Sequence, residues 1–120
     1  GVQVQLITRG ICSIDCINPN IEIKSIIGRY LEHSRIYYFH NNGDDVIGIS
    51  SADILRRNLD RRIEIMLPIK EKKIKKKIRK ILELYWKDDV NSFKKNDNGE
   101  WVKLGYPIGN LNCHEEFYNL

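Results

Sequence analysis

The most constraining feature of this 120-residue sequence is an apolar stripe that runs through a dense block of lysines. Apolar side chains recur every three to four residues between positions 70 and 86, a spacing typical of an α-helix with one buried face. The stripe consists of Ile74, Ile78, Ile81, Leu82 and Tyr85. We therefore predict an amphipathic helix over 70–86 that packs on a core and turns most of its lysines to water.

The same segment makes the whole chain basic. The net charge is +4, yet residues 70–80 alone hold eight basic residues and one acid, so the remainder is net acidic. One interpretation is the solvated face of the helix, which is what such a pattern usually means. The other is a strip that binds a polyanion, such as nucleic acid, a phosphate polymer or a membrane surface.

Composition narrows the class of protein. Hydrophobic residues make up 42% and charged residues 30%, which is typical of one globular domain at this length. No apolar run reaches the ~20 residues of a membrane span, and the start GVQVQLITRG has no signal-peptide pattern. The three cysteines, Cys12, Cys16 and Cys113, are few and odd in number, which argues against a disulfide scaffold. We therefore expect a cytoplasmic, reducing setting.

Alternating or β-rich runs predict strands, and Asn-Gly chemistry over 41–45 predicts a hairpin turn. Asn112 and Glu115 form a capping box that predicts a short terminal helix. The expected strands cover 2–8, 21–27, 36–40, 46–50 and 61–69. This order predicts an α/β fold, with a mixed β-sheet flanked by helices, in a single domain.

The most informative stretch for function lies on either side of the predicted hairpin. His33 and Arg35 share one face of an extended segment, and the return strand is expected to bring Ser50, Ser51 and Asp53 beside them. A cation, an imidazole and hydroxyls at one place suit phosphoryl chemistry. Glu64 is a further candidate, as a carboxylate that orients the His33 ring.

Structural roles for these residues remain open. A lone histidine in a strand is more often structural, and the arginines of 56–62 suit surface ion pairs, which stabilise a protein by only ~0–1 kcal/mol each. The serines and Asp53 also suit the capping of the segment that follows them.

Several runs resemble the C-terminal domain of the bacterial polyphosphate kinase family. They are QLITRGIC (5–12), SIIGRYLEHSRIYYFHNNG (25–43) and ISSADILRRNLDRRIEIMLPI (49–69). The resemblance implies a phospholipase-D-like fold, in which the motifs HSR (33–35) and SSAD (50–53) are related to the H-x-K and G-S-x-N motifs of that superfamily. It also implies reversible, magnesium-dependent transfer of the terminal phosphate of ATP to polyphosphate through a phosphohistidine.

In the family this phosphohistidine belongs to a preceding domain. The resemblance therefore implies that residues 1–120 are the C-terminal catalytic domain of a longer kinase, inactive alone, with Mg²⁺ bound mainly by residues outside it. Arg9 matches the family's ATP-contacting arginine, and His33 its second active-site histidine. Arg35, Ser50, Ser51, Asp53 and Glu64 are expected to line the site. The loop around Cys12 and Cys16 departs from the family pattern.

Two other functions remain as alternatives. A phospholipase-D-type phosphodiesterase needs two H-x-K halves, and Arg35 and Asp53 replace the expected Lys and Asn. A non-catalytic polyanion-binding module would depend on the lysine helix instead. For the kinase, the expected partners are ATP, ADP and polyphosphate, without DNA or RNA, in a homo-oligomer, and a peripheral membrane contact is left open.

The remaining histidines and cysteines carry weaker signals. The Cys12-x-x-x-Cys16 spacing and the adjacent Cys113-His114 invite a zinc interpretation. Neighbouring residues such as Cys113 and His114 rarely ligate one ion together, so no metal site is expected. His40 and His114 are expected at the surface.

Overall fold

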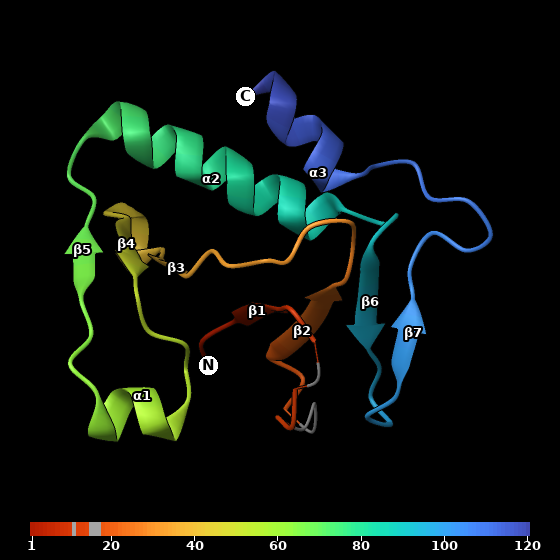
Figure 1. Ribbon diagram of the computed structural model, residues 1–120, viewed down its shortest axis with the longest axis horizontal. Coiled ribbons are helices and arrows are strands. Elements are labelled where there is room, and N and C mark those ends of the chain that lie inside the picture. The colour runs from red at the N-terminus through yellow and green to blue at the C-terminus, as the bar shows by residue number, and fades with distance from the viewer. Residues whose placement is uncertain (11, 15–17) are drawn as a thin grey trace. The chain divides into compact units, whose positions relative to one another are not determined.

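The computed structural model describes residues 1–10, 12–14 and 18–120, and its elements are labelled in Figure 1. The chain divides into two compact units. The first consists of Gly1–Glu32 and Lys80–Leu120, and the second of His33–Arg79. The long helix α2 (Lys72–Lys87) supplies residues to both. The expected α/β class is confirmed, but the strands form two sheets where one mixed sheet was expected.

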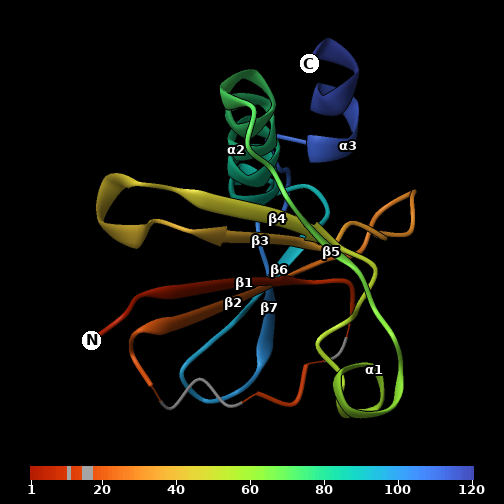
Figure 2. The same ribbon diagram turned by 90° about the vertical axis from the view of Figure 1, so that its left-hand side faces the viewer.

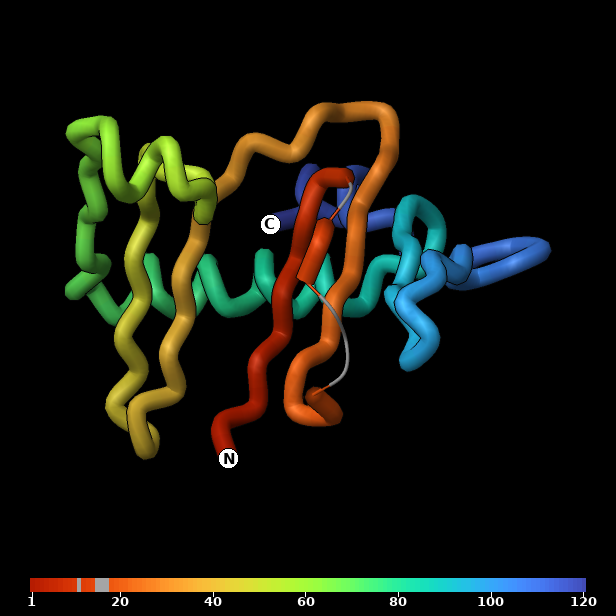
Figure 3. The backbone as a smooth tube through the Cα atoms, turned by 90° about the horizontal axis from the view of Figure 1, so that it is seen from below, coloured from red at the N-terminus to blue at the C-terminus, as the bar shows by residue number. Residues whose placement is uncertain are grey.

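The first unit contains a four-stranded mixed sheet in the order β1-β2-β6-β7. Its strands are β1 (Val4–Thr8), β2 (Ile21–Ile26), β6 (Ser92–Lys95) and β7 (Trp101–Lys103). Strands β1 and β2 run parallel and side by side (Figure 3), with Leu6 opposite Ile23. The other two pairings are antiparallel. Arg9 directly follows the last residue of β1.

The core of the first unit joins this sheet to two helices. Ile26 of β2, Tyr85 of α2 and Cys113 of α3 (Cys113–Glu116) form one buried cluster. Partly buried apolar residues pack around it, namely Ile7, Ile81, Leu84, Leu111 and Phe117. Tyr85 and Ile81 belong to the apolar stripe that predicted the helix, so this part of the stripe packs on a core as expected, whereas Ile74 at the other end is 43% exposed.

A buried carboxylate holds the end of α2. Asp88 is 0% exposed, and its oxygens accept hydrogen bonds from the backbone amides of Asn91 and Cys113 (both 2.8 Å), the Ser92 hydroxyl (2.7 Å) and the Asn91 side-chain amide (3.1 Å). Burial by itself raises the pKa of Asp88, but these hydrogen bonds outweigh it and lower the pKa below the ordinary value. Asp88 therefore ties α2, β6 and α3 together.

The second unit contains a three-stranded antiparallel sheet of β3 (Ile36–Phe39), β4 (Val46–Ser50) and β5 (Met66–Pro68). Strands β3 and β4 form the expected hairpin, visible edge-on in Figure 2. Their turn contains the 3-10 segment η1 (Asn41–Gly43), where Asn42 and Gly43 adopt φ values of 53° and 93°. Asparagine and glycine are the residues that tolerate this left-handed region.

Asp45 attaches the first half of α2 to this hairpin. Its buried carboxylate accepts a hydrogen bond from the Tyr38 hydroxyl at 3.0 Å and pairs with the Arg79 guanidinium. Its backbone carbonyl accepts a hydrogen bond from Lys75 at 2.5 Å. All of these groups belong to the second unit. Lys75 and Arg79 are therefore held at the hairpin, unlike most basic residues of α2.

Two expectations about elements were incomplete. The strand expected over 61–69 is reduced to β5, because the helix α1 (Arg56–Arg61) extends to residue 61 and residues 62–65 form neither helix nor strand. At the start of α1, the backbone carbonyl of Leu55 accepts hydrogen bonds from the backbone amides of Asn58 and Leu59. Strand β6 had no signal in the sequence. The terminal helix and its cap at Asn112 are confirmed, because the Asn112 side chain accepts a hydrogen bond from the His114 amide at the start of α3. Among the described residues the Glu115 side chain makes no return bond to the Asn112 amide, so the second half of the expected capping box is not formed. The 3-10 segment η2 (Phe117–Asn119) follows.

Candidate functional site

The hairpin brings the HSR and SSAD motifs together as predicted. The backbone amide of Ser50 donates to the carbonyl of Arg35 at 2.9 Å, just beyond the paired strands. The Arg35 Nε donates to Asp53 Oδ1 at 2.8 Å, and this ion pair is about four-fifths buried on the arginine side. The Asp53 hydrogen bond is the main reason that the pKa of Arg35 is raised. Asp53 therefore fixes the direction of the guanidinium.

His33 lies beside this fixed cation and is itself exposed to solvent. Its Nδ1 is 3.2 Å from Arg35 Nη1, and its Nε2 is 3.5 Å from Arg35 Nη2. Because a guanidinium can only donate, the ring nitrogen that accepts from Arg35 carries no proton, and a neutral ring carries its proton on the other nitrogen. An accessible N–H beside a fixed positive charge can donate a proton to a phosphoryl oxygen and stabilise its charge.

The two serines and Glu64 hold the segment that follows the hairpin. Ser50 Oγ donates to the carbonyl of Ile65 at 3.2 Å, and Ser51 Oγ donates to Glu64 Oε2 at 2.5 Å. Asn58 of α1 donates to Glu64 Oε1 at 2.9 Å. The hydrogen bonds from Ser51 and Asn58 lower the pKa of Glu64.

These contacts correct one expectation. Within the described part of the chain, Glu64 makes no hydrogen bond to His33, because both of its carboxylate oxygens accept hydrogen bonds from Ser51 and Asn58. The only side chain hydrogen-bonded to the His33 ring among these residues is Arg35. Ser50, Ser51 and Glu64 thus support the backbone of this region, which agrees with the capping role that the sequence left open.

Arg9 lies in the first unit, at the end of β1. Its Nη1 donates to the backbone carbonyl of Glu32 at 3.2 Å. His33 belongs to the second unit, so the expected convergence of the Arg9 and His33 side chains stays a prediction.

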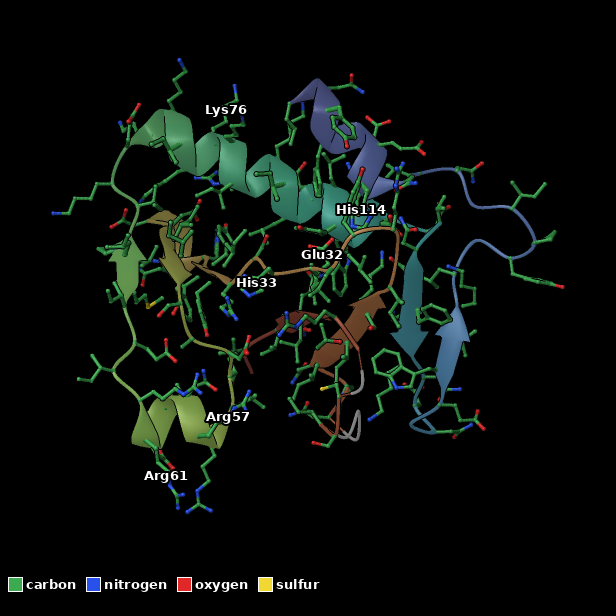
Figure 4. The ribbon with its side chains drawn as sticks, viewed as in Figure 1. Glu32, His33, Arg57, Arg61, Lys76 and His114 are labelled. Atoms are coloured by element: carbon green, nitrogen blue, oxygen red, sulfur yellow. The ribbon has the colours of Figure 1, made fainter. Side chains whose placement is uncertain are left out.

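Glu32 is the centre of a cluster that sequence reasoning missed. Its Oε1 pairs with His114 Nε2, and its Oε2 accepts a hydrogen bond from the Tyr85 hydroxyl at 2.5 Å. The expectation of a surface position for His114 is wrong, since its side chain is only 6% exposed. Figure 4 labels Glu32 and His114. Their separation of 82 residues explains why no local pattern could reveal this pair.

Basic side chains are abundant at the surface of the second unit. The lysines of α2 in this unit are exposed except for Lys75, as the helical stripe predicted. The arginines of α1 are also exposed, and Figure 4 labels Arg57 and Arg61 there together with Lys76 on α2. Arg56 pairs with Asp60 one turn later, at 3.2 Å. His40 is exposed, as expected.

Metal-binding groups do not cluster in the part of the chain that the structure covers. No set of three or more His, Cys, Asp or Glu side chains there is arranged to hold an ion. Cys113 is buried in the core, and Cys16 of the zinc interpretation lies outside the described residues. The carboxylates near His33 do not fit Mg²⁺, because Asp53 pairs with Arg35 and Glu64 accepts two hydrogen bonds. No described helix is both long and apolar enough to cross a bilayer.

Comparison with known proteins gives consistent matches. Residues 1–109 match the family model described as polyphosphate kinase C-terminal domain 2. The polyphosphate kinase of Staphylococcus saprophyticus is 44% identical over 116 residues, which cover 93% of this chain and 16% of that protein. The polyphosphate kinase of Pseudomonas aeruginosa is 43% identical, over 93% of this chain and 17% of that protein.

A solved structure agrees with the sequence matches. The crystal structure of polyphosphate kinase from Porphyromonas gingivalis superimposes with a TM-score of 0.89 at 33% identity, covering 98% of this chain and 19% of that one. This chain thus spans about one-sixth of the length of the curated relatives that it matches. Because the family model covers most of the chain and several relatives exceed 40% identity, the chain belongs to the polyphosphate kinase family, as a C-terminal domain.

Proposed function

We propose that this chain is the C-terminal catalytic part of an ATP:polyphosphate phosphotransferase. In this reaction the bond between the γ-phosphorus of ATP and its bridging oxygen breaks, and ADP leaves. A histidine outside this chain takes the phosphoryl group as an N–P bond, and the terminal oxygen of polyphosphate then accepts it. ATP, ADP and polyphosphate are the proposed partners, and the magnesium that accompanies ATP is bound by residues outside this chain.

The observation that carries the proposal is the exposed His33 ring beside a guanidinium that Asp53 holds in place. A pre-oriented cation needs no reorganisation when charge develops on phosphoryl oxygens, which is why such groups accelerate phosphoryl transfer. His33 is proposed to donate its ring proton or a hydrogen bond to the transferring group, and Arg35 is proposed to orient the His33 ring and to stabilise the charge on the phosphoryl oxygens.

Arg9 is proposed as a second phosphate contact. Its planar guanidinium suits phosphate oxygens, and its hydrogen bond to the Glu32 carbonyl places it next to the residue that directly precedes His33 in the chain. Chain connectivity keeps the His33 Cα about 3.8 Å from that of Glu32.

The first experiment uses a chimera of the Staphylococcus saprophyticus polyphosphate kinase, in which this chain replaces the matching segment. We expect the chimera to make polyphosphate from ATP. His33→Ala in the chimera should lower kcat by about 10²–10⁴-fold, the usual contribution of a positioned proton donor. His40→Ala is the matched control, because it removes an exposed imidazole of the same unit. A folded chimera without kinase activity, or one in which His33→Ala retains full activity, contradicts the proposal.

The second experiment uses the 120-residue chain alone. It should fail to make polyphosphate, because the proposed acceptor histidine is absent. Robust turnover by the chain alone would show that the phosphoryl acceptor has been assigned to the wrong part of the enzyme.

A second function, the binding of a polyanion, is favoured by the exposed lysines of α2. Charge reversal at Lys73, Lys76 and Lys77 tests it, with His33→Ala as the comparison. If binding of long-chain polyphosphate depends on the lysines and not on His33, the helix contributes its own binding surface. Equal binding by the triple variant at physiological salt rules this function out.

A further inference from the structure

The buried pair of His114 and Glu32 suggests a role for the C-terminal helix beyond packing. His114 is the second residue of α3. Its side chain is 6% exposed, and that of Glu32 is 14% exposed. With Nε2 donating to the carboxylate, His114 Nδ1 is buried and has no hydrogen-bond partner among the residues that the structure describes. The only polar contact of this ring in the described residues is therefore the one to Glu32.

The surroundings of His114 are built to hold the ring in one place. Tyr30 contacts it edge-on with centroids 5.5 Å apart, and Phe117 lies on another side at 6.5 Å. A Cβ added at Gly28 would come within 2.8 Å of His114 Cε1, so only glycine permits this approach of the backbone. Because all of these residues belong to the first unit, the ring is fixed within one compact body.

Glu32 is in turn held at three points. Its two carboxylate oxygens contact His114 and Tyr85, and its backbone carbonyl accepts a hydrogen bond from Arg9. These partners come from α3, α2 and the end of β1. Glu32 is also the last residue of the first unit, directly before His33. The peptide that leads into His33 therefore starts from an anchored residue.

We propose that His114 is a positioning residue for His33 and acts through Glu32. The inference rests on the proposed function of His33, because His114 of α3 would hold Glu32, the residue that directly precedes the candidate catalytic histidine. A buried carboxylate that loses one of its two side-chain partners has to move or seek water. A shift of Glu32 would pass directly through one peptide bond to His33.

The deciding measurement uses the 120-residue chain and the ring resonances of its histidines in NMR spectra. His114→Leu should shift or broaden the His33 ring signals, and His114→Gln should restore them in part, because the glutamine amide can donate to Glu32. Ile23→Val is the matched control, a mild core change at a fully buried residue of the same unit. Tyr85→Phe is a second variant that removes one hydroxyl only, so it covers the case in which His114→Leu does not fold.

The outcomes separate positioning from general destabilisation. A response of His33 to His114→Leu and Tyr85→Phe, without a response to Ile23→Val, supports the proposal. Unchanged His33 signals in the folded variants overturn it, as does an equal response to Ile23→Val.

Activity of the chimera distinguishes this proposal from the proposed function. His114→Leu should lower kcat by up to ~100-fold, the effect of misplacing a reacting group by about 1 Å, with little change in KM for ATP, and His114→Gln should recover part of the loss. Full activity of His114→Leu, combined with inactivity of His33→Ala, overturns the positioning role of His114 and leaves the proposed function of His33 standing. Full activity of His33→Ala overturns the proposed function itself.

Discussion

Asp88→Asn should destabilise the first unit more than any other single charge removal of similar size. The carboxylate is fully buried and accepts four hydrogen bonds, two at each oxygen. In asparagine one oxygen becomes an NH₂ group, so either the Cys113 amide or the Asn91 amide faces another donor. At least one hydrogen bond is lost in either orientation, because the Ser92 hydroxyl can also accept from an NH₂ group whereas a backbone amide cannot. A buried donor without an acceptor costs about 1–3 kcal/mol, and we expect a loss of this size in the free energy of unfolding.

Urea denaturation followed by tryptophan fluorescence measures this loss. Both tryptophans of the chain, Trp86 and Trp101, belong to the same unit as Asp88, so their signal reports on that unit. With a slope of about 2 kcal/mol per molar urea, the middle of the usual range, the midpoint should fall by roughly 0.5–1.5 M. Asp97→Asn is the control, because it removes the same charge from an exposed turn and should change stability by less than about 0.5 kcal/mol.

The effect of Asp88 should also depend on pH. Since its folded pKa lies below the ordinary value of 3.8, its stabilising effect is present above that value and is lost as the pH falls through the folded pKa. Asp88→Asn should therefore remove this part of the acid sensitivity. Equal urea midpoints for Asp88→Asn and Asp97→Asn at neutral pH would refute the role assigned to the buried carboxylate.

Three further predictions concern other residues. In a carboxyl NMR titration, the pKa of Glu64 should lie below its ordinary value of 4.5, so the stability that Glu64 contributes is lost as the pH falls through that lower pKa. A pKa at or above 4.5 would contradict the two hydrogen bonds that lower it. Asn112→Ala should cost about 1 kcal/mol in thermal unfolding because it removes the cap of α3, whereas equal stability of Asn112→Ala and Asn110→Ala would argue against capping. Gly105→Ala should lower Tm clearly, since φ is +61° and the new Cβ would lie 2.5 Å from a backbone oxygen. At Gly10 a new Cβ would meet no atom of the described residues within 4 Å, so Gly10→Ala should retain more stability, and the opposite order would contradict this geometry.

The parts of the fold that depend on near neighbours could be predicted from the sequence. The stripe of apolar residues and the lysines between them placed α2, and the Asn-Gly turn placed the β3–β4 hairpin. The hairpin in turn brought Arg35 to Asp53, because antiparallel pairing determines which residues face each other across a tight turn. The meeting of His33, Arg35 and Asp53 within the second unit could therefore be predicted from the sequence.

Lys24 illustrates where sequence patterns stop being informative. In the run IEIKSII it alternates with isoleucines, which normally predicts an exposed lysine. The structure buries Ile23, Lys24, Ser25 and Ile26 in succession, and Lys24 Nζ donates to the carbonyls of Trp86 and Asp88 at the end of α2. Burial lowers the pKa of Lys24, while the nearby Asp88 opposes this effect. A strand that is covered on both faces does not reveal its buried polar residues by alternation.

By itself, the sequence determined the helix, the hairpin, the terminal cap and the meeting of the HSR and SSAD motifs, because each depends on backbone geometry over a few residues or on one turn. Only the tertiary structure decided that Glu64 would bind Ser51 and Asn58, that Asp88 would gather the end of α2 with β6 and α3, and that His114 would reach Glu32. These contacts join distant segments in a shared core, where burial and hydrogen bonding, rather than local periodicity, select the partner of each polar group.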